Sequence, residues 1–120
     1  MAQNIPPELE KDLRKYDNLR RQQEAFANMV ENYKERVRQL NETLENLKKQ
    51  PDDTVTYKAV GQVMFRVEKP AMVDELESET KSLQKGIEQA EKKLETLTPE
   101  LTELQKTIQI ELSKRNLRLQ

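Results

Sequence analysis

The chain has 120 residues, of which 36% are charged and only 34% are apolar, a composition typical of long solvated helices rather than of a compact core of ordinary size. Its 21 basic and 22 acidic residues nearly cancel, so no global field attracts nucleic acid or a membrane surface. It contains no Cys and no His, and its two glycines are too few for a phosphate-binding loop. We therefore expect a protein that is not an enzyme and that binds no metal or other cofactor.

The N-terminal stretch MAQNIPPELEK has no apolar run and does not resemble a signal peptide. Elsewhere the apolar runs are as short as the VMF of residues 63–65, far below the length of a membrane span. We expect a soluble cytoplasmic protein that does not enter a membrane.

The first predicted element is a helix over about residues 8–50. Between Leu9 and Leu47, apolar residues alternate at spacings of three and four, and ten of twelve such positions are apolar; Gln23 is one exception. This spacing is typical of a coiled coil rather than of a helix on a globular domain. Pro51 then ends the helix, because it disfavours the helical conformation of the residue before it.

The second predicted element is a β-hairpin over residues 54–68, the only stretch rich in Val, Thr, Tyr and Phe. A two-residue type II′ turn beginning at Gly61 pairs Val60 with Val63. A three-residue loop centred on Gly61 instead pairs Ala59 with Val63 and places six apolar residues on one face. The first register has the better turn chemistry and the second the better pattern. A slip of one residue exchanges the two faces, so the sequence leaves both registers open.

The third predicted element is a helix over about residues 71–118. The spacing of three and four continues from Val73 to Ile108, where ten of eleven positions are apolar. Pro99 lies inside this segment and removes one backbone hydrogen bond. We therefore expect a kink or a local break in the helix at that point.

Two seams of equal length on either side of a hairpin predict an all-α dominated fold, a long antiparallel two-helix coiled coil with one central β-hairpin. In this arrangement Leu44 lies opposite Leu76 and Tyr33 lies opposite Ile87. The match between the seams worsens away from the hairpin. We therefore expect tight packing near the hairpin and loose packing near the two termini.

The apolar residues of the hairpin have no core to enter within this chain, because the helices use their own apolar residues on each other. An isolated two-stranded hairpin is marginal in water and presents two unpaired edges. A poorly ordered loop is the alternative, but a flexible linker is typically rich in Gly and Ser. We expect the hairpin to join an intersubunit β-barrel through Val55, Tyr57, Val63, Phe65 and Val67.

Apolar residues that miss the seam gather near the two termini. They are Ile5, Leu13, Ile110, Leu112, Leu117 and Leu119. Surplus apolar surface of this kind suits weak binding of exposed hydrophobic segments of other proteins. Ordinary fraying with scattered apolar residues is the alternative interpretation.

Two long helices around one hairpin with YKAVGQVMFRV at its centre resemble a β-class subunit of the prefoldin family, archaeal or eukaryotic, along the whole chain. The hairpin motif of that family is Tyr-Lys, a Gly three positions on, and an aliphatic position three further. Here these are Tyr57, Lys58, Gly61 and Met64, which adds Lys58 and Gly61 to the expected assembly hairpin. A single hairpin fits the β class, since the α class carries two. Pro99 departs from the unbroken second helix of the family.

The resemblance implies one prefoldin-like domain over residues 1–120 and a hetero-hexamer of two α-type and four β-type subunits. It also implies an ATP-independent chaperone that captures unfolded polypeptides at the coiled-coil tips and delivers them to a group II chaperonin. A structural coiled-coil scaffold or tether without client binding is the alternative. A nucleic-acid partner is not expected, because the net charge is only −1 and aromatic stacking platforms are scarce.

Overall fold

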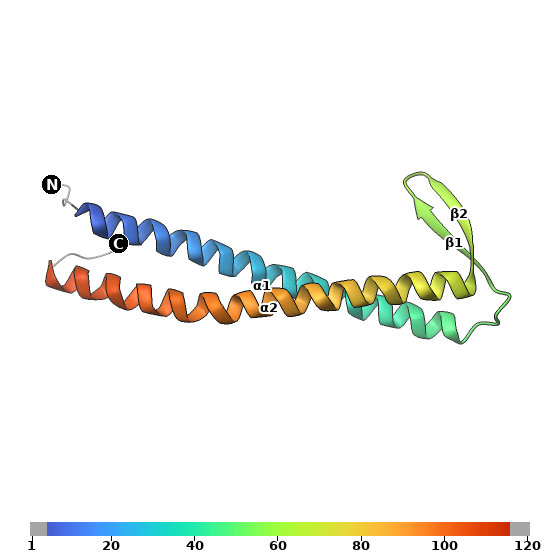
Figure 1. The fold of residues 1–120 in the computed structure, drawn as a ribbon. Coiled ribbons are helices and arrows are strands. Elements are labelled where there is room, and N and C mark those ends of the chain that lie inside the picture. The colour runs from blue at the N-terminus through green and yellow to red at the C-terminus, as the bar shows by residue number, and fades with distance from the viewer. Residues whose placement is uncertain (1–4, 116–120) are drawn as a thin grey trace. The chain divides into compact units, whose positions relative to one another are not determined.

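The computed structural model describes residues 5–115. The chain forms α1 (Pro7–Lys48), β1 (Val55–Val60), β2 (Val63–Glu68) and α2 (Lys69–Lys114) in this order (Figure 1). The helices contain 42 and 46 residues, and the two strands form an antiparallel hairpin between them. The predicted fold class, two long helices with one central hairpin, is confirmed.

Local sequence signals account for both ends of α1 and for the start of α2. Pro7 opens α1, where its missing N–H has no intrahelical acceptor to lose, and the first turn contains two glutamates that favour the positive end of the helix dipole. After Lys48 the backbone N–H of Gln50 donates to the carbonyl of Leu47 at 3.0 Å, and Pro51 prevents another helical turn. Pro70 lies in the first turn of α2, a position that tolerates proline for the same reason as at Pro7.

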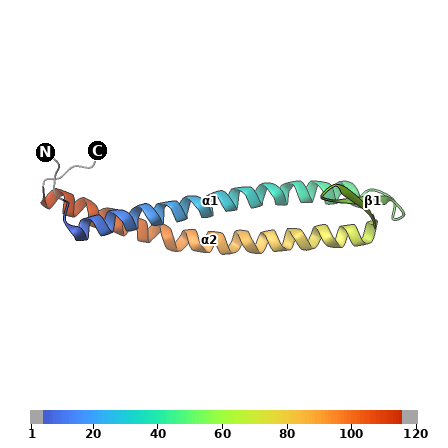
Figure 2. The same cartoon turned by 90° about the horizontal axis from the view of Figure 1, so that it is seen from above.

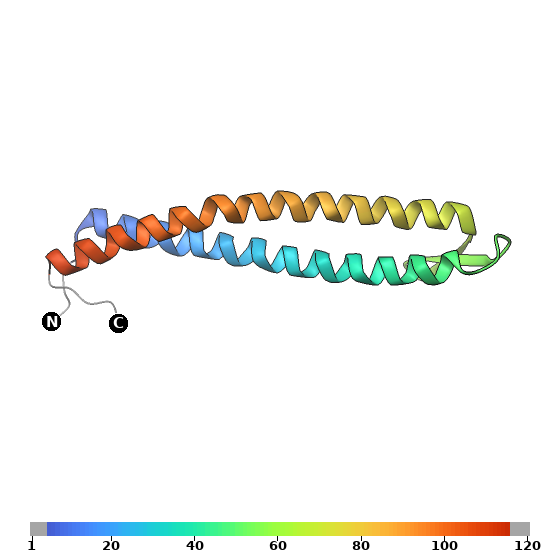
Figure 3. The ribbon, with the colours of Figure 1, turned by 90° about the horizontal axis from the view of Figure 1, so that it is seen from below.

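The chain divides into two compact units, each containing part of both helices. Among the described residues, the terminal unit comprises residues 5–29 and 90–115, and the hairpin unit comprises residues 30–89. Views from above and below show the helices side by side within each unit (Figures 2 and 3).

The terminal unit is held together by a buried apolar cluster. Leu19 of α1 packs with Leu97 and Leu101 of α2, and partly buried side chains surround them. The seam continues outward to Leu9 and Ile108, which are only 2% and 4% exposed. The prediction of loose packing near the termini is therefore wrong for residues 9–108, because the apolar seam is long enough to bury both outer ends.

Pro99 does not break α2, which is continuous from Lys69 to Lys114. Pro99 cannot donate to the carbonyl of Glu95, but both residues are exposed, so water can satisfy that carbonyl. Thr98, the residue before Pro99, takes part in a contact between the helices. Its hydroxyl accepts a hydrogen bond of 3.1 Å from the side-chain amide of Gln23, which links α1 to α2. Gln23, an exception in the predicted seam, thus has a polar partner across the helix pair.

The hairpin unit contains a second part of the helix seam, with Leu40 and Leu44 buried on α1. Thr80 on α2 is also buried, and its hydroxyl donates to the backbone carbonyl of Leu76 at 2.9 Å, so the one polar residue in the α2 seam is satisfied. Tyr33 lies so close to Gly86 that an added Cβ would be 2.7 Å from the ring atom Cε2. This contact agrees with the predicted helix register, which places Tyr33 opposite the next residue along α2.

The structure contains the first of the two hairpin registers. Val60 pairs with Val63, and Lys58 pairs with Phe65. The two-residue turn between the strands has Gly61 at φ 59°, the positive value that the primed hairpin turns require at their first central position. Turn chemistry therefore outweighs the single apolar face of the alternative register, which is not observed.

Candidate assembly and client-binding surfaces

The hairpin exposes large apolar side chains that nothing else in the described part of the chain covers. Five are more than half exposed, namely Tyr57, Val60, Val63, Met64 and Phe65. Val55 is 40% exposed, and Val67 is partly buried at the base of the hairpin. This concentration of apolar surface on twelve paired residues is unusual for a chain so rich in charge.

The observed register distributes these apolar side chains over both faces of the hairpin. One face, here called the Tyr57 face, carries Val55, Tyr57, Ala59, Met64, Arg66 and Glu68. The opposite face, here called the Phe65 face, carries Thr56, Lys58, Val60, Val63, Phe65 and Val67. Since large apolar groups project from both faces, complete burial of the hairpin requires contacts on both.

The hairpin also has two free edges within the described chain, because its sheet contains only β1 and β2. The outer backbone N–H and C=O groups of such strands are available to pair with further strands. Gly61 contributes to this surface by making the tight turn that keeps both strands in register. The predicted assembly residues are thus brought together on one small sheet.

A buried lysine lies at the base of the hairpin, where β2 passes directly into α2. The side chain of Lys69 is 8% exposed. Its Nζ donates to the carbonyl oxygen of Gln50 at 2.6 Å and is 3.4 Å from both the carbonyl oxygen of Lys48 and Oδ1 of Asp52. Sequence reasoning missed this residue, because its acceptors lie about twenty positions earlier in the chain and no short-range pattern links them.

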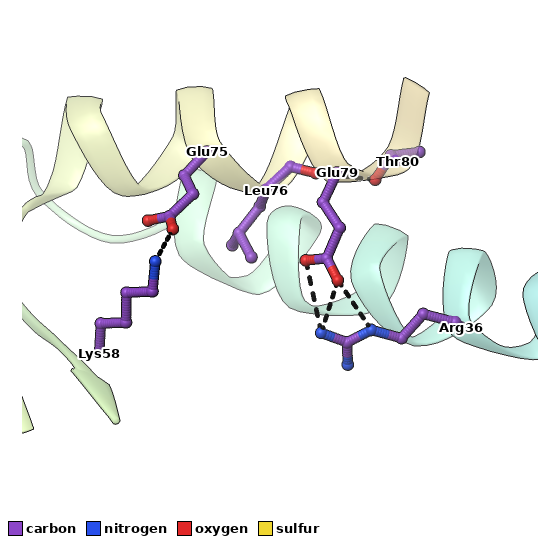
Figure 4. A network of polar contacts seen from close by, with 6 residues as sticks. All are labelled: Arg36, Lys58, Glu75, Leu76, Glu79 and Thr80. Carbon is purple, nitrogen blue, oxygen red and sulfur yellow. Dashed lines mark hydrogen bonds and ion pairs between the residues drawn. The ribbon is translucent and has the colours of Figure 1, made fainter. Parts of the chain in front are cut away.

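Ion pairs connect three basic side chains to the early part of α2. Lys58 of β1 pairs with Glu75, and Arg36 of α1 pairs with Glu79 at 3.1 Å (Figure 4). Lys48, near the end of α1, pairs with Glu77 at 3.0 Å. All of these side chains are 41% exposed or more, so each pair contributes little to stability by itself, on the order of 0.2–1 kcal/mol. Together they link both α1 and the hairpin to the same two turns of α2.

A further polar cluster lies on the exposed face of α1. Arg38 donates to Glu35 at 2.7 Å and to Glu42 at 3.2 Å. The hydrogen bonds from Arg38 lower the pKa of Glu35, and the same contact raises the pKa of Arg38 above its ordinary value. This is a solvated network that supports the helix.

The predicted client-binding residues fall into three groups. Ile5 and Ile110 are 41% and 54% exposed. Leu13 and Leu112 are partly buried. The remaining two candidates, Leu117 and Leu119, lie outside the described residues.

Leu13 and Tyr16 of α1 line a small hollow in the terminal unit, together with three residues of α2, Gln105, Ile108 and Gln109. The hollow has a volume of about 120 Å³. Leu13 is predicted to lie outside the seam, but it lines the same hollow as the seam residue Ile108 and so borders the seam. Ile110 follows two residues after Ile108 on α2 and is 54% exposed, so it projects from a different side of the helix than the buried Ile108.

Within residues 5–115, no three acidic side chains converge into a group that could hold a metal ion. Neither of the described helices is long and apolar enough to cross a membrane.

The chain is similar to known proteins along most of its length. It is 31% identical over 103 residues to prefoldin subunit beta of Thermococcus gammatolerans, covering 83% of this chain and 88% of the relative. It is 30% identical over 114 residues to prefoldin subunit beta of Sulfolobus acidocaldarius, covering 95% and 91%.

A solved structure is similar in fold as well as in sequence. The crystal structure of the prefoldin beta subunit from Thermococcus strain KS-1 superposes with a TM-score of 0.74 at 26% identity, over 92% of this chain and 97% of that one. The family model described as prefoldin subunit matches residues 10–115, which include both helices almost entirely and the whole hairpin. These likenesses confirm the resemblance that the hairpin motif indicated: the chain belongs to the prefoldin subunit family, and the relatives it matches are of the β class.

Proposed function

We propose that this chain is a β-class subunit of an ATP-independent chaperone, a holdase that keeps unfolded polypeptides from aggregating and passes them to a group II chaperonin. Membership of the prefoldin family supports the class of activity. The observation that carries the proposal is the exposed apolar hairpin, because such a surface in a highly charged chain needs partner subunits to cover it.

In this proposal the hairpin assembles the oligomer, a hetero-hexamer with two α-type and four β-type subunits. The free edges of β1 and β2 pair with strands of neighbouring subunits to close a β-barrel. The proposed assembly residues remain Val55, Tyr57, Lys58, Gly61, Val63, Phe65 and Val67. Met64, the most exposed of the apolar residues at 66%, joins them.

Clients bind at the ends of α1 and α2 that are remote from the hairpin along each helix. The apolar side chains in this region are exposed to different extents. Burial of one exposed apolar side chain against a client contributes at most about 1.5–3 kcal/mol to the free energy of binding. Several subunits acting together convert such weak contacts into useful avidity. A surface of this kind discriminates little between client sequences and releases each client without nucleotide hydrolysis.

The assembly step is tested by Phe65→Asp. Phe65 is 53% exposed in the isolated chain, so the variant should retain its helices as measured by circular dichroism. A carboxylate buried without a partner in the subunit interface costs several kcal/mol, so native mass spectrometry with an α-type prefoldin subunit should show no hexamer. Asn28→Asp adds the same charge to an exposed position of α1 and should assemble normally. A full hexamer formed by the Phe65 variant would refute the role of the hairpin.

The client-binding step is tested by deleting residues 1–7 together with residues 112–120. The assembly should remain intact and should lose its suppression of the aggregation of a denatured model protein. A finer variant, Ile110→Ser, should weaken suppression, whereas Gln22→Ser at an exposed position of α1 should not. Equal protection by truncated and full-length assemblies would place the client-binding surface elsewhere.

The same aggregation assay separates the proposal from the alternative of a scaffold or tether without clients. A scaffold assembles through the hairpin but gives no protection at any ratio of assembly to client. Protection by the complete assembly in the absence of ATP supports the chaperone.

A further inference from the structure

We infer that Lys69 and the Lys58–Glu75 ion pair are positioning residues that hold the hairpin in one orientation on its own helices, so that partner subunits meet a preorganised surface. This inference rests on the proposed function, in which the hairpin assembles the oligomer, because a fixed orientation of the hairpin matters only when partner subunits bind it. It assigns these side chains contacts within one chain rather than contacts with a partner.

Lys69 ties together the two points at which the chain enters and leaves the hairpin. It follows the last residue of β2 directly, and its ammonium group reaches the carbonyls of Lys48 and Gln50 at the end of α1. The Lys48 carbonyl lies at the negative end of the helix dipole of α1, and the Gln50 carbonyl lies two residues beyond the helix, so neither has a helical N–H to accept from. One buried cation therefore satisfies the end of α1 and fixes the base of the hairpin beside it.

Lys58 fixes the hairpin at a second point, in the strand rather than at its base. It lies on the Phe65 face and pairs with Glu75, in the second turn of α2 (Figure 4). Lys58 therefore connects the Phe65 face of the hairpin to α2 of the same chain, and the Tyr57 face lies on the side of the hairpin opposite this contact. Two separate attachments restrict rotation of the hairpin more than either does alone.

Restricting the hairpin before assembly favours association for an entropic reason. A two-stranded hairpin is marginally stable by itself, and a mobile one must be ordered when it binds. The contacts of Lys69 and Lys58 order the hairpin in the free chain. The entropy cost of ordering the hairpin is then met during folding and does not weaken the association of subunits. Loss of either attachment should therefore weaken assembly while the helix pair stays folded.

The Lys58–Glu75 attachment is tested by charge reversal. Lys58→Glu and Glu75→Lys should each weaken hexamer formation with an α-type prefoldin subunit by about two- to fivefold, the range expected for a partly exposed ion pair. The double variant Lys58→Glu/Glu75→Lys restores the pair with opposite sign and should regain wild-type assembly. Single variants that both assemble like the wild type would overturn the inference. So would a double variant that assembles no better than the singles, because Lys58 would then contact a partner instead of Glu75.

The Lys69 attachment is tested by Lys69→Met, which keeps the apolar stem and removes the cation. Lys49→Met is the matched control, because Lys49 is an exposed lysine directly after α1 that pairs only with Glu45 among the ion pairs described. The Lys69 variant should assemble at least about tenfold more weakly than the control, since a buried charged hydrogen bond is lost. Its helical circular dichroism should match that of the control.

Hydrogen exchange on the isolated chain tests the same inference without any partner. The amides of residues 55–68 should exchange faster in the Lys69→Met variant than in the control. Equal exchange together with equal assembly would overturn the role of Lys69 but leave the proposed function intact. Failure of the unmodified chain to assemble with an α-type subunit would instead refute the proposed function, whatever the exchange rates.

Discussion

Gly86 lies in the interior of α2, where glycine costs about 1 kcal/mol relative to alanine, and the ring of Tyr33 gives the reason for its presence. A Cβ at position 86 would lie 2.7 Å from Cε2 and 3.1 Å from Cδ2 of that ring, well inside van der Waals contact. The perturbation that tests this reading is Gly86→Ala, alone and in a Tyr33→Ala background.

Two opposing effects determine the outcome. Helix propensity favours alanine by about 1 kcal/mol, and overpacking of a partly buried contact costs about 1–3 kcal/mol. With Tyr33 present, we expect Gly86→Ala to lower the free energy of unfolding by up to about 2 kcal/mol. With Tyr33 replaced by alanine no ring atom remains to clash, and the same substitution should raise it by about 1 kcal/mol. The expected interaction energy of the double-mutant cycle is therefore about 1–3 kcal/mol.

Urea unfolding followed by circular dichroism, at one fixed protein concentration for all four proteins, measures the cycle, because assembly makes apparent stability depend on concentration. The sign change between the two backgrounds is the critical result. If Gly86→Ala stabilised the protein equally with and without Tyr33, the ring would adjust at no cost, and the close approach would not explain the glycine.

Three further changes test other contacts. Pro99→Ala should restore one backbone hydrogen bond within a helix that is already continuous. We expect it to raise the free energy of unfolding by up to about 3 kcal/mol and to slow hydrogen exchange around position 99. Unchanged exchange would mean that the missing hydrogen bond costs no stability there. Gln23→Leu should raise the free energy of unfolding by about 0.5–1 kcal/mol, because apolar contact in the seam outweighs one exposed hydrogen bond to Thr98, and a loss of stability would show that this bond is the stronger effect. Because Arg38 lowers the pKa of Glu35, the ionised carboxylate stabilises the folded chain at neutral pH, and this contribution is lost as the pH falls through the lowered value. The stability difference between wild type and Glu35→Gln should accordingly shrink in acid, and an NMR titration that gave Glu35 an ordinary pKa would contradict the assignment.

Much of the fold could be predicted because the signals are local. The alternation of three and four between Leu9 and Leu47 defines a helix seam, and Pro51 gives its end. A single Val-rich stretch around Gly61 defines the hairpin. The spacing does not predict how Gln23 and Pro99 affect the helix pair. A polar residue or a proline is tolerated in a helix when water or a partner such as Thr98 satisfies the unpaired hydrogen-bonding groups.

The candidate sites could be predicted in part. Apolar hairpin residues without a core were visible from composition and periodicity, and the structure places them on one exposed sheet. The client-binding candidates are the apolar residues that miss the seam spacing, and spacing alone does not give the depth at which a residue such as Leu13 is buried beside the seam.

The sequence by itself determined the order and type of the elements and the family motif in the hairpin, because each follows from residues close together in the chain. It also determined the antiparallel pairing of the helices, because two seams of equal length lie on either side of one hairpin. Only the tertiary structure decided the hairpin register, the burial of Lys69 and the approach of Tyr33 to Gly86. The physical reason is that each of these depends on groups separated in sequence. The register balances the turn at Gly61 against burial of whole faces, and Lys69 is buried only where the end of α1 comes to lie beside the start of α2.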